Sequence, residues 1–277
     1  MSTTNAVDVE TLKARLKTTW MAGNYDYFSR FMESSAVEFL ARLPLHPADR
    51  MLDVACGSGQ LALLAARKGA RVTGIDIATN SIEAARGRAR SERLDAKFDE
   101  GDAEELPYDD EAFDLVASIF GAMFAPRPER VARELVRVCR RGGTIAMANW
   151  TREGFIGRMF QTIGKFVAPP GMPSPLLWGD ETTVRQRFGN TVANLSLTRT
   201  MYRFDYAFPP EGVVDFFRQN YGPAHRAFAT LQPAEQAALG QALVELWSAA
   251  IQSGEPGRTI VDAEYLEVVA TRAHEDK

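Results

Sequence analysis

Two glycines follow a short apolar run in a pattern that could seat a small molecule. The run from Met51 to Val54 leads into Ala-Cys-Gly-Ser-Gly, and apolar residues at helical spacing resume at Leu61. This order predicts a buried parallel strand, a tight turn and the first turn of a helix. Gly57 and Gly59 allow backbone angles and close approaches that a Cβ would forbid, and the helix start offers unpaired N–H groups to a ligand.

Two acidic residues accompany this turn. Asp53 lies on the apolar strand, where an unpaired carboxylate is costly, so we expect it to accept hydrogen bonds from the loop or to meet a cationic ligand group. Asp76 ends the next apolar run, about 20 residues later, the separation at which a ribose-binding carboxylate follows the glycine loop in βαβ nucleotide folds. The acids and glycines together favour a nucleoside cofactor.

Four motifs in order resemble those of the class I S-adenosylmethionine-dependent methyltransferases. They are Leu-Asp-Val-Ala-Cys-Gly-Ser-Gly at 52–59, Gly-Ile-Asp at 74–76, Gly-Asp-Ala at 101–103 and Phe-Asp-Leu-Val at 113–116. The resemblance is strong over 52–150 and only topological afterwards, and it is nearest to the small-molecule methylases of ubiquinone and menaquinone biosynthesis. It implies S-adenosylmethionine as the cofactor.

The resemblance also implies a cofactor site at the strand ends. Its residues are Asp53, Ala55, Gly57, Ser58, Gly59, Asp76, Ile77, Asp102, Ala103, Ser118 and Phe120. In this arrangement Asp76 holds the ribose hydroxyls, and Asp102 accepts the exocyclic amine of adenine. The alternative is that Asp76 caps a helix and Asp102 is a turn residue. Asp114 begins a strand, and we expect it to be structural.

A methyl acceptor would bind beside the methionine end of the cofactor. Methyl transfer from a sulfonium is a direct displacement, so the protein mainly aligns the reactants and excludes water. If a general base is needed, His225 and Tyr25 are candidates. The expected acceptor pocket suits an apolar or flat small molecule, unless several of its residues only fill the core. Its residues are Tyr25, Met123, Phe124, Trp150, Phe155, Met159 and Trp178.

Two other functions remain open at this point. The fold could bind S-adenosylmethionine without transferring its methyl group, as a regulatory module or a catalyst of rearrangement. A nicotinamide-dependent oxidoreductase is suggested only by the match of residues 57–62 to G-x-G-x-x-A, and the sequence has no evident Tyr/Lys or His arrangement for hydride transfer.

The composition limits which binding partners are expected. The 277 residues are 45% hydrophobic with a net charge of −4, which permits a large core and disfavours nucleic acid as a partner. No apolar run is long enough to span a membrane, and the polar start from Met1 to Lys13 has no apolar core of a signal peptide. We therefore expect a cytoplasmic protein. It is expected to be a monomer or a homodimer. Cys56 and Cys139 are expected to be structural, and the three histidines lack metal-ligand spacing.

The pattern of apolar runs predicts an α/β fold. Residues from about Val9 to Leu43 are expected to be helical. Strands and helices alternate from Arg50 to Trp150, with the fifth strand at Thr144 to Asn149, which calls for a parallel sheet. Two helices are expected further on, at Glu211 to Tyr221 and Pro233 to Ile251. With the resemblance, the prediction is a Rossmann-like, seven-stranded, mostly parallel sheet with an antiparallel terminal hairpin, helices on both faces and a helical cap. The expected parts are a helical cover (1–48), a cofactor-binding core (49–150), an apolar cap segment (151–192) and terminal strands (193–277) with inserted helices (211–251) in the same domain as the core.

Overall fold

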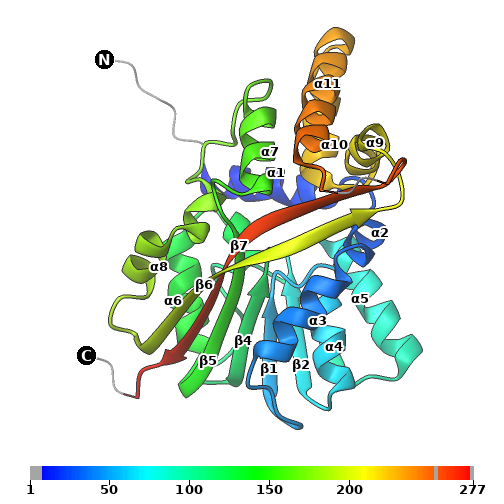
Figure 1. Cartoon of the computed structure of the whole chain (residues 1–277). Helices are drawn as coiled ribbons and strands as arrows, with labels where there is room; N and C mark the ends of the chain where they lie inside the picture. The colour runs from blue at the N-terminus through cyan, green and yellow to red at the C-terminus, as the bar shows by residue number, and fades with distance from the viewer. Residues whose placement is uncertain (1–7, 253–254, 275–277) are drawn as a thin grey trace, which may run out of the picture.

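A seven-stranded sheet forms the centre of the molecule (Figure 1). The computed structural model describes residues 8–252 and 255–274. The strand order is β3-β2-β1-β4-β5-β7-β6, and only the pairings of β7 with β5 and β6 are antiparallel. The predicted fold class is therefore confirmed. The strands are β1 (Arg50–Val54), β2 (Arg71–Asp76), β3 (Ala96–Glu100), β4 (Phe113–Ile119), β5 (Cys139–Trp150), β6 (Val192–Tyr206) and β7 (Thr259–Arg272).

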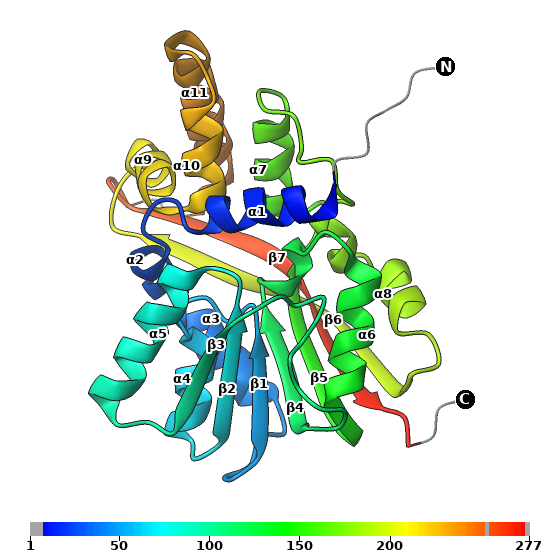
Figure 2. The same ribbon diagram turned by 180° about the vertical axis from the view of Figure 1, so that it is seen from behind.

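Helices cover both faces of this sheet, and a further group stands over the carboxyl ends of its strands. One face carries α3 (Glu33–Arg42), α4 (Gln60–Arg67) and α5 (Thr79–Glu92), and the other carries α6 (Pro128–Val138) and α8 (Glu181–Phe188). Figure 2 shows α1 lying across the strand ends, beneath α7 and α10. The remaining elements are α1 (Val9–Trp20), α2 (Tyr25–Arg30), α7 (Phe155–Gly164), α9 (Pro210–Asn220), α10 (Gly222–Ala229), α11 (Pro233–Ala250) and the 3₁₀ turns η1 (Ala122–Phe124) and η2 (Pro175–Gly179).

Local sequence explains why these elements begin where they do. Helix α6 has Pro128 in its first turn, where the missing N–H costs nothing, and its apolar face buries Val131, Leu135 and Val138 against the sheet. Strand β1 is buried from its second residue onward because α-helices cover the sheet on both sides. The pattern from Arg50 to Trp150 thus produces the expected alternation of strand and helix.

Several boundaries differ from the sequence prediction. The stretch from 9 to 43 is three helices, with the first break at Gly23, whose φ is +73°. Strand β5 starts at Cys139 instead of Thr144, because the backbone of Gly142 and Gly143 continues within the strand. Helix α10 was not predicted, since its Gly222-Pro223 start reads as a turn; here the proline lies in the first helical turn.

The segment 151–192 covers the strand ends only in part. Helix α7 stands over them, whereas α8 packs against α6 and β6 beside the sheet (Figure 1). The cover is instead built by α1, α2, α7 and the inserted helices. Aromatic side chains join those helices to β6: the ring of Phe204 on β6 lies 6.3 Å from that of Phe217 and 5.8 Å from that of Trp247, and Phe28 lies 5.0 Å from Phe217. The helices inserted between β6 and β7 therefore share one core with the sheet.

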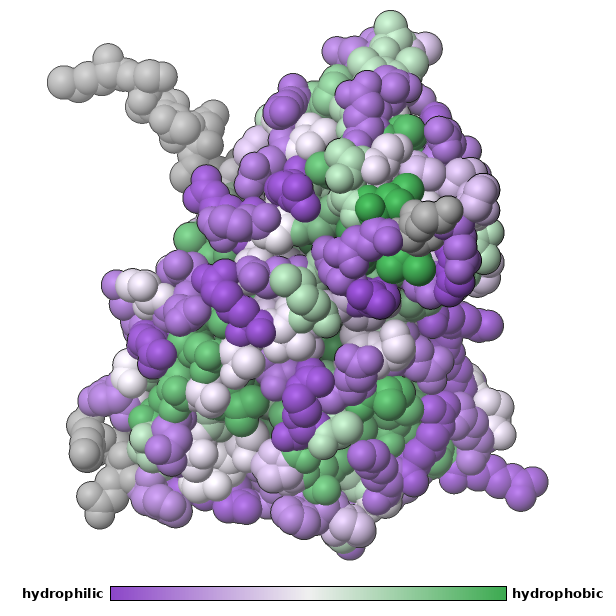
Figure 3. Space-filling model, in the orientation of Figure 1, coloured by the Kyte–Doolittle hydropathy of each residue, from purple (hydrophilic) through white to green (hydrophobic). Residues whose placement is uncertain are grey.

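The surface is mostly polar. Figure 3 shows hydrophilic residues over much of one face, with smaller apolar areas between them. Among the described residues, the large hydrophobic side chains with most exposure are Met21, Tyr27, Val37 and Met201. Within 8–252 and 255–274, no helix is both long and apolar enough to cross a membrane.

Candidate functional site

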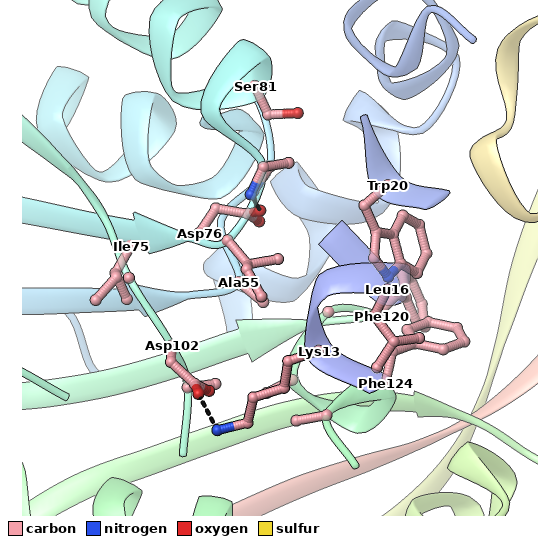
Figure 4. A pocket seen from close by; sticks show the side chains of 18 of the residues that line it. Lys13, Leu16, Trp20, Ala55, Ile75, Asp76, Ser81, Asp102, Phe120 and Phe124 are labelled. Carbon is pink, nitrogen blue, oxygen red and sulfur yellow. Dashed lines mark hydrogen bonds and ion pairs between the residues drawn. The ribbon is translucent and has the colours of Figure 1, made fainter. Parts of the chain in front are cut away.

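A pocket opens at the carboxyl ends of the parallel strands, between the turns after β1, β2, β3 and β4 and the helix α1 (Figure 4). Its empty space, with the open solvent at its mouth included, is about 750 Å³. Ligands of open α/β sheets bind at this edge because the strand order reverses there. In this sheet the reversal falls between β1 and β4.

The floor of the pocket is the small-residue turn after β1. Ala55, Gly57 and Gly59 all have positive φ, at 56°, 54° and 83°. A Cβ on Gly57 would lie 3.0 Å from the ring of Tyr25, and one on Gly59 would lie 3.1 Å from the ring of Phe98. Both glycines are therefore required by backbone angle and by space, as predicted. Ala55 and Gly57 line the pocket, while Gly59 sits behind the turn.

Asp76 is held in the pocket wall by backbone donors. Its Oδ2 accepts a hydrogen bond from the N–H of Gly57 at 2.8 Å, and its Oδ1 accepts one from the N–H of Ala78 at 2.8 Å. Burial raises the pKa of this carboxyl group, and the N–H groups of Ala78 and Gly57 oppose that rise. A carboxylate has about four acceptor positions, so both oxygens keep capacity for ligand hydroxyls.

Asp53 lies beneath the turn and does not line the pocket. Its side chain is buried, with Oδ2 accepting a hydrogen bond from the N–H of Ala62 at 3.1 Å, while Oδ1 has no hydrogen-bond partner. Burial raises the pKa of Asp53 to about 8, opposed by the Ala62 N–H and reinforced by the charge of Asp76. The donor belongs to the first turn of α4 and not, as expected, to the loop, and a pKa of about 8 favours the protonated carboxyl at neutral pH.

The turn after β3 carries a second carboxylate whose oxygens are both occupied. Asp102 Oδ1 accepts a hydrogen bond from the N–H of Glu104 at 2.8 Å, and its Oδ2 forms an ion pair with Lys13 of α1. Lys13 also lies 2.9 Å from the buried carboxylate of Glu104, which Arg127 contacts at 2.6 Å. Burial alone would lower the pKa of Lys13, but its bonds to the two carboxylates raise it.

Lys13 was not among the residues predicted from the motifs. Its helix was expected as a cover, but amphipathic spacing identifies the buried face without identifying the strand end that this face meets. Leu16 and Ser81 are also pocket residues that sequence reasoning missed. Their only signals are an apolar position on α1 and a place in the first turn of α5.

Aromatic rings form the apolar side of the pocket. The ring centroid of Trp20 lies 4.9 Å from that of Phe124 and 5.8 Å from that of Tyr25, both edge-to-face, and Phe120 also lines the cavity. Burial, with the charges of Asp76 and Asp53, raises the pKa of the Tyr25 phenol above its usual range. Tyr25 is therefore a neutral phenol that can donate a hydrogen bond.

The pocket gathers many of the predicted residues. They come from five segments far apart in the chain and meet at one edge of the sheet: Tyr25, Ala55, Gly57, Asp76, Ile77, Asp102, Ala103, Phe120 and Phe124. The prediction that these segments converge is thereby supported by geometry. Whether each of these residues touches the cofactor or the acceptor stays a prediction.

Other predicted residues lie elsewhere. The predicted residues that do not line the pocket are Asp53, Ser58, Gly59, Ser118, Met123, Trp150, Phe155, Met159, Trp178 and His225. Ser118 accepts a hydrogen bond from the N–H of Ala122 and so braces η1. Trp150 stacks on Phe120 with ring centroids 3.8 Å apart, and His225 is exposed on α10 beside the carbonyl of Arg218.

The larger of these side chains pack in the core, which is the alternative given for them in the sequence analysis. Phe155 packs on Trp247 at 4.4 Å, and the guanidinium of Arg187 lies 4.4 Å from the ring of Trp178. Met123 and Met159 are buried. These side chains fill space between the sheet and its cover. In this structure, fewer aromatic and methionine side chains line the pocket than the sequence led us to expect.

The remaining sequence predictions concern residues outside the pocket. Asp114 at the start of β4 binds Arg50 and Arg140 at 3.0 and 2.7 Å, which confirms its structural role. Cys56 and Cys139 are buried free thiols. Over 8–252 and 255–274, His, Cys, Asp and Glu side chains form no group arranged to hold a metal ion.

The family match and some of the named relatives are methyltransferases. Residues 52–147 match a family described as a methyltransferase domain. An uncharacterized protein of Mycobacterium bovis is 36% identical over 277 residues, spanning 97% of this chain and 98% of its own. The 27-O-demethylrifamycin SV methyltransferase of Amycolatopsis mediterranei is 35% identical over 135 residues, 46% of this chain and 50% of its own.

A solved structure has the same fold. It is a phosphoethanolamine N-methyltransferase of Haemonchus contortus, in complex with phosphomonomethylethanolamine and S-adenosylhomocysteine. The TM-score is 0.57 at 17% identity, over 87% of this chain and 52% of that one. Because the covered share is larger than residues 52–147, the structural similarity extends beyond the matched domain.

Proposed function

Since the chain belongs to the class I S-adenosylmethionine-dependent methyltransferases, we propose that it transfers the methyl group of that cofactor to a small apolar or aromatic molecule bound in the pocket at the strand ends. The enzyme class and the cofactor follow from the family. The observation that carries the choice of acceptor is the character of the pocket wall beside Trp20, Phe120 and Phe124, which is aromatic and uncharged.

In this proposal the cofactor lies across the ends of β1, β2 and β3. Asp76 binds the ribose hydroxyls with the acceptor positions left free by its two backbone bonds. Asp102 accepts the adenine amine, Ile77 and Ala103 contact the ring, and the backbone at Gly57 passes beneath the methionine part. The close approach of the turn, which a Cβ would block, supports this placement.

We assign the segments accordingly. Residues 1–48, as far as they are described, cover the site, 49–150 bind the cofactor, and the terminal strands with their inserted helices belong to the same domain. Within 151–192, α7 approaches the site through Phe160, whose ring centroid lies 6.0 Å from that of Phe124. This contact supports an acceptor that enters between α1, η1 and α7.

The main chemical role of the protein is to align the methyl donor and the acceptor. The methyl group moves from a sulfonium to a nucleophile in one displacement, so holding both partners in line and excluding water supplies most of the rate. Among the described residues that line the pocket, the titratable side chains are Lys13, Tyr25, Asp76 and Asp102. The raised pKa of Tyr25 keeps the phenol protonated, so little phenolate is present to act as a base. The acceptor must then be nucleophilic itself or lose its proton to solvent.

The test has two stages. Isothermal titration with S-adenosylhomocysteine first measures binding to the folded protein. Transfer of labelled methyl from S-adenosylmethionine is then measured over a panel of apolar phenols, hydroxylated polyketides and amines, with tRNA and protein substrates as contrasts. Binding with transfer only to small acceptors supports the proposal. Binding with transfer to tRNA or protein alone refutes the acceptor class, and binding without any transfer favours a non-methylating role.

A further inference from the structure

Glu104 lies directly behind the pocket wall, in the turn after β3. Asp102 and Ala103 line the cavity, whereas the side chain of Glu104 is completely buried and does not line it. Its Oε2 accepts a hydrogen bond from Nε of Arg127 at 2.6 Å and lies 2.9 Å from Nζ of Lys13, and its Oε1 accepts a bond from the N–H of Arg127. A carboxylate is costly to bury unless it is paired, and Glu104 has two cationic partners.

The ammonium group of Lys13 is shared among three carboxylates. It pairs with Asp102, lies 2.9 Å from Glu104 and lies 3.8 Å from the exposed Glu10. Figure 4 marks the contact with Asp102 at the pocket wall. An ammonium group has three donors and no acceptor, so each donor has a carboxylate to bind. Lys13 therefore lines the pocket while its donors are directed to protein groups.

This sharing matters for the purine that the pocket accepts. Adenine carries an amine at position 6, which donates hydrogen bonds, whereas a 6-oxo purine carries a carbonyl there, which accepts them. If Asp102 binds the adenine amine, as proposed above, a 6-oxo purine would place its carbonyl against the carboxylate. Lys13 could relieve that conflict by donating to the carbonyl. Glu104 opposes this, because it binds the same ammonium from the side away from the pocket.

We propose that Glu104 is a positioning residue that makes the pocket selective for the adenine amine, by holding Lys13 away from the purine and limiting how far Lys13 neutralises Asp102. Arg127 acts in the opposite sense, because it binds the same Glu104 oxygen as Lys13 does. This inference rests on the cofactor placement proposed above, and adds how that placement becomes selective.

The test compares S-adenosylhomocysteine with S-inosylhomocysteine, which has a carbonyl in place of the amine. Isothermal titration of the full chain gives the ratio of the two dissociation constants for each variant. Glu104→Gln keeps the shape of the side chain but releases Lys13, so the preference for the adenosyl compound should fall by about two- to tenfold, the range of one hydrogen bond. Arg127→Gln removes the competing cation from Glu104, so Lys13 is held more firmly and the preference should rise.

Glu134→Gln is the matched control. Glu134 also binds an arginine and a backbone N–H of the same segment, since it pairs with Arg137 at 2.7 Å and accepts a hydrogen bond from the N–H of Leu106 at 2.7 Å. It is not one of the carboxylates around Lys13. Loosening the segment through Glu134 should weaken binding of both compounds alike and leave their ratio unchanged. A merely structural role of Glu104 would give that same result.

An unchanged ratio in Glu104→Gln overturns the assignment, as does an equal fall in Glu134→Gln. If Glu104→Gln does not fold, Arg127→Gln decides, and a ratio that stays at the wild-type value or falls overturns the assignment. Two other results bear on the proposed function instead. Equal affinity of the wild type for the two compounds refutes the placement of the adenine amine on Asp102, and failure to bind either compound refutes the cofactor site itself.

Discussion

Replacing Asp53 by asparagine would remove a carboxyl group that the fold keeps protonated. Burial raises its pKa to about 8, while an unfolded chain would release the proton near a pKa of about 3.9. Because the folded pKa of this acid is raised, the unfolded state loses its proton first, and stability falls as the pH rises from about 4 to about 8. The slope is at most about 1.4 kcal/mol per pH unit, so the wild type should lose roughly 2.7 kcal/mol relative to Asp53→Asn between about pH 5 and pH 7.

The assay is urea unfolding of the ligand-free protein, followed by circular dichroism at several pH values. The difference in unfolding free energy between Asp53→Asn and the wild type should grow with pH. Asp114→Asn is the matched control, because bonds to Arg50 and Arg140 hold the pKa of Asp114 below its usual range. That carboxyl is ionised in the folded and unfolded states between about pH 5 and pH 7. The difference in unfolding free energy between Asp114→Asn and the wild type should therefore be constant over this interval and shrink only at lower pH.

A flat difference for Asp53→Asn across the same interval would refute the reasoning. It would mean that Asp53 is ionised within the fold, and hence that its Oδ1, which has no hydrogen-bond partner in this structure, is solvated or paired in solution. Since the comparison is between variants of one protein, the titration of other groups cancels. The amide of asparagine keeps an oxygen to accept the Ala62 hydrogen bond, so the loss of that bond should not dominate the result.

Three further variants probe the site directly. Asp76→Ala should weaken binding of S-adenosylhomocysteine by about 1–3 kcal/mol in isothermal titration, because the ribose loses a charged acceptor; unchanged affinity would remove Asp76 from the site. Gly57→Val should reduce binding further, since φ is +54° and the added carbon meets the ring of Tyr25, and normal binding would place the cofactor elsewhere. Tyr25→Phe should leave the pH dependence of methyl transfer unchanged, whereas loss of a rise in rate with increasing pH would identify Tyr25 as the base.

That the expected cofactor residues converge could be predicted because they lie in short, contiguous segments. Asp76 ends β2, Gly57 and Asp102 follow β1 and β3 within a few residues, and parallel strands deliver their carboxyl ends to one edge. Once the strands are assigned, the convergence of these residues needs no further information. The same logic identified Asp114 as structural, since it starts its strand and so lies at the opposite edge.

The acceptor side could not be predicted with the same reliability. Aromatic and methionine side chains look alike in the sequence whether they line a cavity or fill a core. Trp150 follows a strand end as Phe120 does, yet it is buried by stacking on Phe120. Lys13 was missed for a related reason. Its place in the pocket depends on how α1 crosses the sheet, and tertiary packing against α9 and α10 decides that angle.

The position of an acid along the sheet explains why the same residue type has different roles. At the amino end of β4, Asp114 is neutralised by Arg50 and Arg140, so its oxygens are committed to structure. At the carboxyl end, turns and helix starts supply N–H groups, and these hold Asp76 without any cation. A carboxyl group held by backbone N–H groups keeps part of its accepting capacity for a ligand. Asp102 is intermediate, since one oxygen has a backbone partner and the other a lysine from a helix that covers the site. Of the three acids, Asp102 is therefore the one that combines a backbone donor with a cation from outside the sheet.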